Sequence, residues 1–382
     1  MRLKFLLLGL LACNMAFAQK KPYLLVGTYT DGKGQGIYVY NFNTKTGDDS
    51  LLSVTKTTNP SYLAVAPNNK TVYAVNETHD TTGSYIGGSV TAFSFDGANG
   101  KLTNMGKQNS GGTDPCYVSV TNNGKYVFVG NYSSGTFAEL AVKADGSLDT
   151  ARQVIAHTGT GPDKARQEGP HVHSTVLSPD NNYLFVSNLG IDKVMIYKVN
   201  KTTGNLTLAP TPFAATAGGT GPRHFDFAPN KKYAYLITEM GANVIAYRYE
   251  NGKLVKLQDI SILPKNFKGE VGAADIHVSH DGQFLYCSNR GIANNITIFS
   301  INQTTGKLTV AGFQSTLGKT PRNFNFDPTG NFLLVANQLS DNIIIFKINK
   351  KTGMLTDTGK RIEVPNPICI KWVASLPSKG GF

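Results

Sequence analysis

The sequence predicts an all-β fold, a seven-bladed β-propeller with four antiparallel strands in each blade, and three series of repeated motifs support this prediction. Strand starts, polar turns and glycine-containing turns each recur at intervals of about 50 residues, a spacing typical of propeller blades. Only 16% of the 382 residues are charged, whereas glycine occurs 40 times, tyrosine 17 times and phenylalanine 20 times. Such a composition favours many short strands joined by tight turns. The sequence shows no long stretch with helical periodicity.

The first series marks the start of the strand that we expect to lie innermost in each blade. Six of its seven members contain a proline, which fixes the backbone angle at which the chain enters the strand. The series occupies residues 59–62, 114–117, 169–171, 221–224, 274–275, 320–323 and 366–369.

The second and third series mark turns inside each blade. Clusters of Asn, Asp, Gly and Pro between aromatic and β-branched runs predict six hairpin turns, at 67–70, 122–125, 179–182, 229–232, 280–283 and 327–331. Seven later turns contain a glycine that is usually followed two residues on by leucine, and these glycines are Gly47, Gly100, Gly146, Gly204, Gly252, Gly306 and Gly353. Each unit is therefore expected to hold four strands joined by a turn, a loop and a second turn.

The two ends of the chain predict how the ring closes. One unit lacks the hairpin turn, because the chain begins with a second-strand pattern at 23–28 and ends with a first-strand pattern at 367–374. The C-terminal strand is therefore expected to complete the N-terminal blade, which leaves no sheet edge exposed. We expect residues 19–382 to form this one propeller domain.

Residues 1–18 have the pattern of an export signal that is removed from the mature protein. Arg2 and Lys4 precede an apolar run at 5–12, and Ala-Phe-Ala at 16–18 is typical of a cleavage site. The apolar run is too short to cross a membrane, so we expect a periplasmic or secreted protein without a transmembrane segment. A lipoprotein-like sequence ending at Cys13 offers an alternative, in which this residue would carry a lipid anchor. The Ala-Phe-Ala site makes soluble export the preferred interpretation.

Charge and motif content argue against several classes of function. The formal net charge is +12, but the lysines are scattered over polar turns and form no dense basic run with aromatic residues, which argues against nucleic-acid binding. A diffuse positive field favours a small anionic ligand instead. The sequence has no His-Glu-x-x-His motif, paired cysteines, carboxylate-rich loop, Gly-x-Ser-x-Gly motif or phosphate-binding loop. We therefore predict neither a metal nor a cofactor, and no motif indicates an oligomeric state.

Polar and charged residues collect at one face of the predicted ring. In antiparallel strands, the start of the first strand and the end of the second lie at the same face. The first-strand starts that meet this condition hold His171, His173, Arg223, His224, Asp275, His277, Arg322 and Asn323. The second-strand ends hold Asn76, Glu77, Asn131, Tyr132, Asn188, Glu239, Asn289, Arg290, Asn337 and Gln338. Cationic groups outnumber carboxylates among them, which favours an anionic, oxygen-rich ligand over a purely structural ion-pair network. The asparagine that ends five of the seven second strands also has a structural interpretation, as a cap for loop backbone groups.

Several of these motifs resemble the lactonase family of seven-bladed β-propellers. This family includes bacterial 6-phosphogluconolactonases of the propeller type and fungal carboxy-cis,cis-muconate cyclases. The resemblance is carried by Gly-Pro-His-Val-His-Ser at 169–174, Gly-Pro-Arg-His at 221–224, Ser-Asn-Arg-Gly at 288–291 and Pro-Arg-Asn-Phe at 321–324, and it extends over nearly the whole chain. Tyr117 departs from the family pattern, in which a histidine is usual at this place, and Asp275 stands where a glutamate is common.

The resemblance implies hydrolysis of a sugar lactone, with 6-phosphogluconolactone or a related aldonolactone as the expected substrate. It places the catalytic group on Glu239, Arg223, Arg290 and His173, with His171 as the alternative histidine. Water would attack the ring carbonyl, Glu239 or His173 would accept its proton, and an arginine would stabilise the oxyanion. The expected substrate-binding residues are His171, His224, Asp275, His277, Arg322, Asn337 and Gln338.

Two other functions are compatible with the same cationic residues. A carboxymuconate-type cycloisomerase would use them to bind carboxylates, and ring closure would change the ultraviolet absorbance of the substrate. A non-catalytic exported propeller would bind a sugar acid or a cell-envelope partner without turnover. The export signal itself favours a lactone other than a phosphorylated sugar, because phosphorylated sugars are mainly cytoplasmic.

Overall fold

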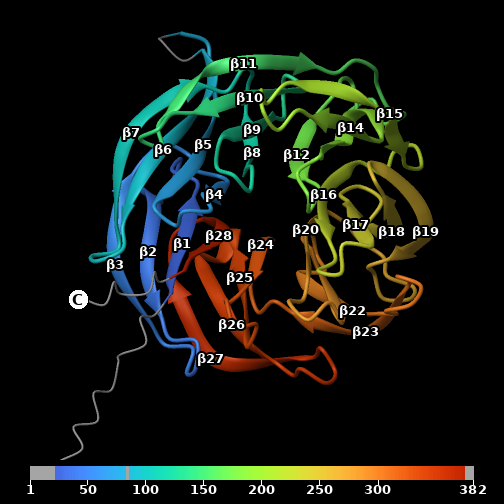
Figure 1. Ribbon diagram of the computed structural model, residues 1–382. Helices are drawn as coiled ribbons and strands as arrows, with labels where there is room; N and C mark the ends of the chain where they lie inside the picture. Colours follow the sequence, from blue (N-terminus) through green and yellow to red (C-terminus); the bar gives the residue numbers. More distant parts are fainter. Residues whose placement is uncertain (1–21, 83–85, 375–382) are drawn as a thin grey trace, which may run out of the picture.

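The computed structural model describes residues 22–82 and 86–374, which form a ring of seven four-stranded antiparallel sheets (Figure 1). The predicted all-β, seven-bladed propeller is confirmed. The predicted signal peptide at 1–18, including Cys13, lies outside the described residues. Helical structure in the described part is limited to two 3-10 turns, η1 (Leu189–Ile191) and η2 (Gln338–Ser340). Within the same residues, no helix has the length and apolar character that crossing a membrane requires.

Each blade is one sheet, and its strands follow one another from the central channel outward in chain order, except that β28 is the innermost strand of blade 1. Blade 1 contains β28 (Pro367–Val373), β1 (Tyr23–Thr28), β2 (Gly36–Phe42) and β3 (Asp49–Lys56). Blade 2 contains β4 (Leu63–Val65), β5 (Thr71–Asp80), β6 (Gly87–Asp96) and β7 (Lys101–Asn109). Blade 3 contains β8 (Pro115–Val120), β9 (Tyr126–Asn131), β10 (Thr136–Val142) and β11 (Leu148–Ala156).

The remaining blades repeat this order. Blade 4 contains β12 (Val172–Leu177), β13 (Tyr183–Asn188), β14 (Lys193–Val199) and β15 (Leu206–Ala215). Blade 5 contains β16 (Pro222–Phe227), β17 (Tyr233–Thr238), β18 (Asn243–Glu250) and β19 (Lys253–Ser261). Blade 6 contains β20 (Ala273–Val278), β21 (Phe284–Asn289), β22 (Asn295–Ile301) and β23 (Leu308–Ser315). Blade 7 contains β24 (Pro321–Phe326), β25 (Phe332–Asn337), β26 (Asn342–Ile348) and β27 (Leu355–Glu363).

The ring closes in blade 1, as the two chain ends predicted. Strand β28 pairs antiparallel with β1, and the register aligns Leu25 with Lys371 and Val26 with Ile370. The last strand of the chain is therefore the innermost strand of the first blade. Because the two ends of the chain are tied together in this sheet, blade 1 has four strands like the other six blades.

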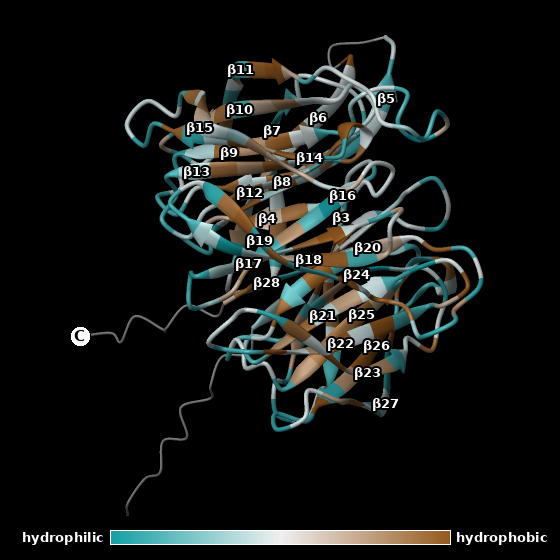
Figure 2. Cartoon of the chain, turned by 90° about the vertical axis from the view of Figure 1, so that its right-hand side faces the viewer, coloured by the Kyte–Doolittle hydropathy of each residue, from teal (hydrophilic) through white to brown (hydrophobic). Residues whose placement is uncertain are grey.

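Burial explains why the strands differ in sequence pattern. The second strand of most blades is buried along its whole length, as in β13 and β25, because neighbouring blades cover both of its faces. These strands therefore read as continuous apolar runs rather than as alternating ones. The outermost strands, such as β11, alternate between buried and exposed residues. Figure 2 shows the resulting apolar strands inside the disc and the polar loops at its rims.

The recurring glycine turns pack against aromatic rings of the blade that precedes them in the ring. Gly306 has a φ of +70°, and a Cβ at this position would lie 2.3 Å from the ring of Tyr233. The carbonyl oxygen of Gly306 also accepts a hydrogen bond of 3.0 Å from the Tyr235 hydroxyl. Gly353 repeats the arrangement with Phe284 and Tyr286. Glycine recurs here because both the backbone angle and the approach of a ring leave no room for a side chain.

The asparagines at the ends of the second strands hold the loops at the mouth of the channel. The Asn131 side chain donates to the Ser110 carbonyl at 2.9 Å, and the Asn76 side chain donates to the Thr58 carbonyl at 2.6 Å. The Asn289 side chain accepts from the backbone N–H of Gly272 at 3.2 Å. The structural interpretation of these asparagines is confirmed, and the loops that they fix include the one that carries Gly272 beside the site.

Candidate functional site

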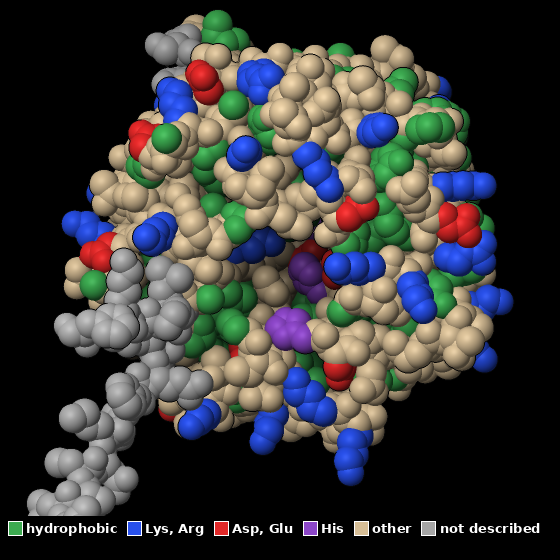
Figure 3. Space-filling model, in the orientation of Figure 1, with side chains coloured by type: hydrophobic (Ala, Val, Ile, Leu, Met, Phe, Trp, Pro, Cys, Tyr) green, Lys and Arg blue, Asp and Glu red, His purple; other side chains and the backbone are tan. Residues whose placement is uncertain are grey.

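One face of the ring carries a polar hollow at the end of the central channel. Register pairs Pro222 with Thr238 and Ala273 with Asn289, so first-strand starts and second-strand ends meet at this face, as predicted. Figure 3 shows histidine, acidic and cationic side chains around the central opening. The topology therefore gathers residues from blades that are far apart in the sequence.

Glu239, directly after β17, is the centre of this cluster. Its Oε2 atom accepts from Nε of Arg223 at 2.8 Å and from Nη2 of Arg290 at 3.1 Å. Its Oε1 atom accepts from Nη2 of Arg166 at 2.7 Å. Nε2 of His173 lies 3.9 Å from Oε2. The structure thus brings together all four residues predicted to be catalytic, and it adds a third arginine.

Charge, rather than burial, sets the protonation of this carboxylate. The Glu239 side chain is only 9% exposed, and burial alone would raise its pKa. The charges of Arg290 and Arg223 override burial and hold the pKa of Glu239 well below its ordinary value. Glu239 is therefore ionised at neutral pH, and three guanidinium groups around one carboxylate leave a net positive site that attracts an anionic ligand.

Arg223 and Arg290 are both anchored by backbone carbonyls of β20 and the loop before it. Arg223 is 1% exposed, and its Nη1 donates to the Ala274 carbonyl. Arg290 donates through Nε to the Gly272 carbonyl at 2.9 Å. Burial lowers the pKa of Arg290 to about 10 although Glu239 opposes this effect, so the guanidinium remains charged at neutral pH. Both arginines are therefore fixed before any ligand arrives.

His173 on β12 and His171, the residue directly before this strand, differ in their surroundings. His173 is 5% exposed, and burial together with the charge of Arg223 lowers its pKa well below its ordinary value. Its imidazole is therefore neutral. His171 stacks on Tyr132 with ring centroids 4.5 Å apart, and its Nε2 lies 3.1 Å from Glu168. His173, not its alternative His171, is the histidine that approaches Glu239.

A second polar group lies deeper in the channel, around Asp275. Its carboxylate contacts Nδ1 of His224 at 2.7 Å and Nε2 of His277 at 3.2 Å, and it accepts a hydrogen bond from Asn323. Asp275 is 1% exposed. Burial would raise its pKa, but the charge of His277 and the hydrogen bond from His224 hold it well below the ordinary value.

The sequence predicted that this Asp275 group binds substrate. Asp275, His224 and His277 were expected to bind substrate, but their ring nitrogens and carboxylate oxygens contact one another and Arg223. None of the three lines the cavity beside Glu239. Successive inward-facing positions of one strand lie at different depths, which the sequence pattern did not separate. Their contact with substrate stays a prediction, and their contacts with one another also give them a structural role.

The protonation of His277 predicts an alkaline loss of stability. Burial would lower its pKa, but Asp275 and Asp226 raise it to about 9 from an ordinary 6.5. The folded protein therefore keeps a proton that the unfolded chain releases between these values. The free energy of unfolding is expected to fall by up to about 3 kcal/mol between pH 6.5 and 9. Denaturant unfolding of wild type and His277→Gln across this range checks it, and an equal pH dependence in both proteins would contradict it.

Arg322 is a cation without a counter-ion in direct contact. Among residues 22–82 and 86–374, its guanidinium has no hydrogen-bond or ion-pair partner, and it lies over the ring of Tyr29 with Cζ 5.5 Å from the centroid. The Tyr29 hydroxyl donates to Glu77 at 2.8 Å. Burial would lower the pKa of Arg322, but the charges of Tyr29, Glu77 and Glu239 raise it. Its free donors suit an anionic group of a ligand.

Asn337 and Gln338, the last two predicted substrate-binding residues, have a different setting. Asn337 is fully buried, and its side chain donates to the Thr316 carbonyl at 3.0 Å. The backbone N–H of Gln338 donates to the Thr320 carbonyl at 3.0 Å, where η2 begins. Neither residue lines the cavity. Asn337 is one of the loop-holding asparagines, and the contact of these two residues with substrate stays a prediction.

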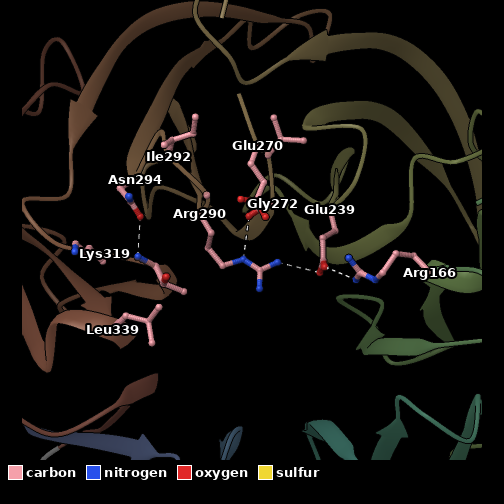
Figure 4. Close-up of a pocket in the computed structure, with 12 residues that line it drawn as sticks. Arg166, Glu239, Glu270, Gly272, Arg290, Ile292, Asn294, Lys319 and Leu339 are labelled. Carbon is pink, nitrogen blue, oxygen red and sulfur yellow. Dashed lines mark hydrogen bonds and ion pairs between the residues drawn. The ribbon is translucent and has the colours of Figure 1, made fainter. Parts of the chain in front are cut away.

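A cavity of about 600 Å³ opens directly beside Glu239, within the range of about 300–1,000 Å³ for small-molecule sites. Figure 4 shows Arg290 between Lys319 and Glu239, with Arg166 on the far side of the carboxylate. The remaining lining residues are Glu270, Val271, Gly272, Gly291, Ile292, Asn294, Thr320 and Leu339. Glu239 and Arg290 are thus the two predicted catalytic residues that face this space.

The sequence reasoning missed Arg166 and the loop that carries it. Residues 157–171, between β11 and β12, form the longest connection between two blades. The charged run Asp163-Lys164-Ala165-Arg166-Gln167-Glu168 within it was a usable signal, because long loops at one end of a scaffold often carry functional groups. Its residues belong to none of the three repeat series, and for that reason they were passed over.

The cluster has no arrangement suited to a metal. In the part of the chain that the structure describes, no group of three or more His, Cys, Asp or Glu side chains is placed to hold a metal ion. Cys116, Cys287 and Cys369 are buried free cysteines. The charged residues that line the cavity are Arg166, Glu239, Glu270, Arg290 and Lys319.

Comparison with known proteins yields close matches over most of the chain. A family model described as "Lactonase, 7-bladed beta-propeller" matches residues 23–372. A Formosa agariphila protein named 6-phosphogluconolactonase is 40% identical over 357 residues, which cover 92% of this chain and 98% of that protein. A Bacillus subtilis protein of the same name is 37% identical, with 91% and 97% covered. The structure of a Pseudomonas aeruginosa periplasmic gluconolactonase has a TM-score of 0.88 and 38% identity, with 93% of this chain and 99% of that chain covered.

Proposed function

The chain belongs to the lactonase family of seven-bladed β-propellers, and we propose that it hydrolyses an aldonolactone in the cavity beside Glu239 and Arg290. One observation carries this proposal. An ionised carboxylate and an anchored guanidinium, 3.1 Å apart, both line a cavity of small-molecule size. Lactone hydrolysis needs a proton acceptor for water and a cation for the carbonyl oxygen, and these two side chains supply them.

The reaction proceeds in two steps in this proposal. Glu239 takes a proton from a water molecule as the water oxygen bonds to the lactone carbonyl carbon. Arg290 donates hydrogen bonds to the oxyanion of the tetrahedral intermediate. The intermediate then collapses, the bond between the carbonyl carbon and the ring oxygen breaks, and Glu239 returns the proton to that oxygen. The product is an open-chain hydroxy acid, and Glu239 is again ionised.

Arg223 and His173 support this chemistry through Glu239, since neither residue lines the cavity. Arg223 is almost completely buried and does not line the cavity, so it positions Glu239 rather than touching substrate. The neutral imidazole of His173 lies 3.9 Å from Glu239 Oε2, where it can share the proton that the carboxylate receives. These roles refine the sequence hypothesis, which left the choice of proton acceptor and of oxyanion donor open.

The surplus of positive charge indicates an anionic substrate. Arg166, Arg223, Arg290 and Arg322 all interact with Glu239, directly or through its charge, which leaves the mouth positive before substrate binds. Two of the relatives carry the name 6-phosphogluconolactonase. Although export favours an unphosphorylated lactone, the positive mouth leads us to take 6-phosphogluconolactone as the first candidate. We propose that its phosphate reaches Arg322, which is not among the residues that line the cavity, because binding there breaks no ion pair among the described residues.

Replacing Arg322 with methionine is expected to weaken substrate binding more than turnover. A hydrogen bond to a charged group contributes about 1.5–3 kcal/mol, which corresponds to an increase in KM for 6-phosphogluconolactone of about 10-fold to 100-fold. The value of kcat is expected to stay close to that of wild type. Steady-state kinetics with Arg361→Met as control, an arginine on the outer strand β27, measures the difference. A loss confined to kcat would contradict the assignment.

The direct test of the proposed function is the rate of lactone opening. Purified protein is added to 6-phosphogluconolactone and to gluconolactone, and acid release is followed against the spontaneous rate. We expect acceleration of at least one of the two lactones, with the larger kcat/KM for the phosphorylated one. Rates equal to the spontaneous reaction for both would refute the proposal.

Export is the second part of the proposed function. The pattern at 1–18 is that of a signal peptide, and the related Pseudomonas aeruginosa gluconolactonase is described as periplasmic. We propose that this chain likewise acts outside the cytoplasm, cleaved after Ala18. Mass spectrometry of the protein from cell fractions tests this, since cleavage after Ala18 and a lipid-modified Cys13 give different N-termini. A full-length cytoplasmic protein would contradict it.

A further inference from the structure

The two carboxylate oxygens of Glu239 have different partners. Oε2 is held by Arg223 at 2.8 Å and by Arg290 at 3.1 Å, both of which are anchored to backbone carbonyls. Among residues 22–82 and 86–374, the one hydrogen-bond or ion-pair partner of Oε1 is Nη2 of Arg166 at 2.7 Å. Because Arg166 also lines the cavity, it covers the oxygen of Glu239 through which a water molecule in the cavity could be deprotonated.

Arg166 is the one of these three arginines that has freedom to move. Its side chain is 45% exposed, compared with 17% for Arg290 and 2% for Arg223. It comes from the connection between blades 3 and 4, whereas Arg223 and Arg290 extend from strand β16 and from the end of β21. A half-exposed ion pair contributes little net free energy, so its guanidinium can exchange partners at small cost.

The backbone below Arg166 is, in contrast, held firmly. Gln167 is fully buried, and its side chain donates to the Leu189 carbonyl at 2.8 Å. The carboxylate of Asp163 accepts from the backbone N–H groups of Ala165 and Arg166 at 3.0 and 3.2 Å. The side chain can therefore swing from a fixed base. The Tyr132 hydroxyl, 3.3 Å from Nη2, offers a further polar contact during this movement.

We propose that Arg166 is a substrate-operated latch on Glu239. In the free enzyme it covers Oε1, and an anionic group of the bound lactone draws it away and exposes the proton acceptor. This inference rests on the proposed function. The phosphate of a bound lactone carries up to two negative charges, whereas Glu239 carries one that Arg223 and Arg290 already share. Arg166 therefore gains by transferring to the phosphate, and Glu239 gains basicity at the moment when the substrate is in place.

The latch makes Arg166 a specificity-determining residue for anionic lactones. A neutral lactone offers Arg166 no competing anion, so the guanidinium stays on Glu239 and keeps the carboxylate a weak base. An anionic lactone releases it and also gains a charge-assisted contact. Discrimination between the two substrates therefore arises in kcat as well as in KM.

The test compares 6-phosphogluconolactone with gluconolactone for wild type and Arg166→Ala. For the phosphorylated lactone, Arg166→Ala is expected to lower kcat/KM by about 10-fold to 100-fold, since one charged contact is lost. For gluconolactone the same variant is expected to raise kcat several-fold, because Oε1 is no longer covered. Lys164→Ala is the matched control, a cation of the same loop that does not line the cavity, and its kinetics should equal those of wild type.

The pH profile supplies a readout that a purely structural role would not change. Removing a cation from Glu239 raises its pKa, so the acidic limb of the kcat profile for gluconolactone should move to higher pH in Arg166→Ala. Arg166→Lys should lie between wild type and Arg166→Ala, because it keeps the charge but loses the planar fork. Both measurements use the intact enzyme.

Each outcome decides between the alternatives. Opposite effects of Arg166→Ala on the two lactones, with a shifted acidic limb, support the latch. Equal losses for both lactones, or no change for either, overturn the latch while the enzyme remains a lactonase. If wild type opens neither lactone, the proposed function is refuted, and the latch proposal is refuted as well because it rests on that function.

Discussion

Replacing Glu239 with glutamine is expected to lower kcat/KM for lactone opening by about 10²–10⁴-fold, the usual contribution of a positioned proton acceptor. Glutamine has nearly the same shape and can fill the same space between Arg223 and Arg290. It cannot take a proton from water at neutral pH, and it leaves the guanidinium groups without a counter-charge. Kinetics with 6-phosphogluconolactone measure the loss.

The control for this change is Glu270→Gln, which alters a second carboxylate that lines the same cavity. Glu270 makes no ion pair to the arginines of the site among the described residues, so this variant is expected to keep kcat/KM within a few-fold of wild type. Circular dichroism should show that both variants are folded. Comparable losses in the two variants, or full activity in Glu239→Gln, would show that Glu239 is not the proton acceptor.

Replacing Asp275 with alanine is expected to lower the free energy of unfolding by about 3–5 kcal/mol, the typical cost of removing one partner from a buried charged network. Its carboxylate holds His224, His277 and Asn323 across three blades. Without it, a charged His277 is left without its nearest counter-ion, and the Asn323 amide loses its acceptor. Urea unfolding measures the change.

The matched control for Asp275 is Asp149→Ala, which removes an exposed carboxylate from the outer strand β11. Surface substitutions of this kind usually change stability by less than about 0.5 kcal/mol. A loss for Asp275→Ala no larger than that of the control would contradict the structural role assigned to the deep channel group. A protein that unfolds normally but no longer binds substrate would return Asp275 to the substrate contacts.

The fold was predictable because its repeat depends on the local backbone preferences of prolines and glycines. Pro222 and its counterparts fix the angle of each innermost strand, and glycines such as Gly306 meet a positive φ together with a tightly packed ring. The closure by β28 followed from one absent hairpin turn. These features act within a few residues or repeat around the ring, so a single sequence is enough to recognise them.

The candidate site was only partly predictable, because topology assigns residues to a face but not to a depth. Glu239, Arg223, Arg290 and His173 were correctly expected to meet. Asp275, His224 and His277 were expected to bind substrate, and the structure shows them in contact with one another. Depth depends on bulges at the starts of the inner strands, such as the register shift between Pro222 and Phe225, which no sequence motif announces.

Tyr117, which departs from the family pattern, packs against other aromatic rings. Its ring stacks on Tyr62 with centroids 4.1 Å apart, and it meets the edge of His224 at 5.4 Å. The Nζ atom of Lys371 lies over the Tyr62 ring, 4.3 Å from its centroid. Aromatic packing therefore occupies the place where a histidine is usual in the family, next to the deep channel group.

The most direct test of the central claim, that lactones open beside Glu239 and Arg290, is the crystal structure of the protein with the reaction product 6-phosphogluconate. The product carboxylate is expected within hydrogen-bond distance of Arg290, with its phosphate on Arg322 and Arg166 turned away from Glu239. Product bound elsewhere on the propeller, with Arg166 still on Glu239 and the cavity holding only water, would contradict the claim.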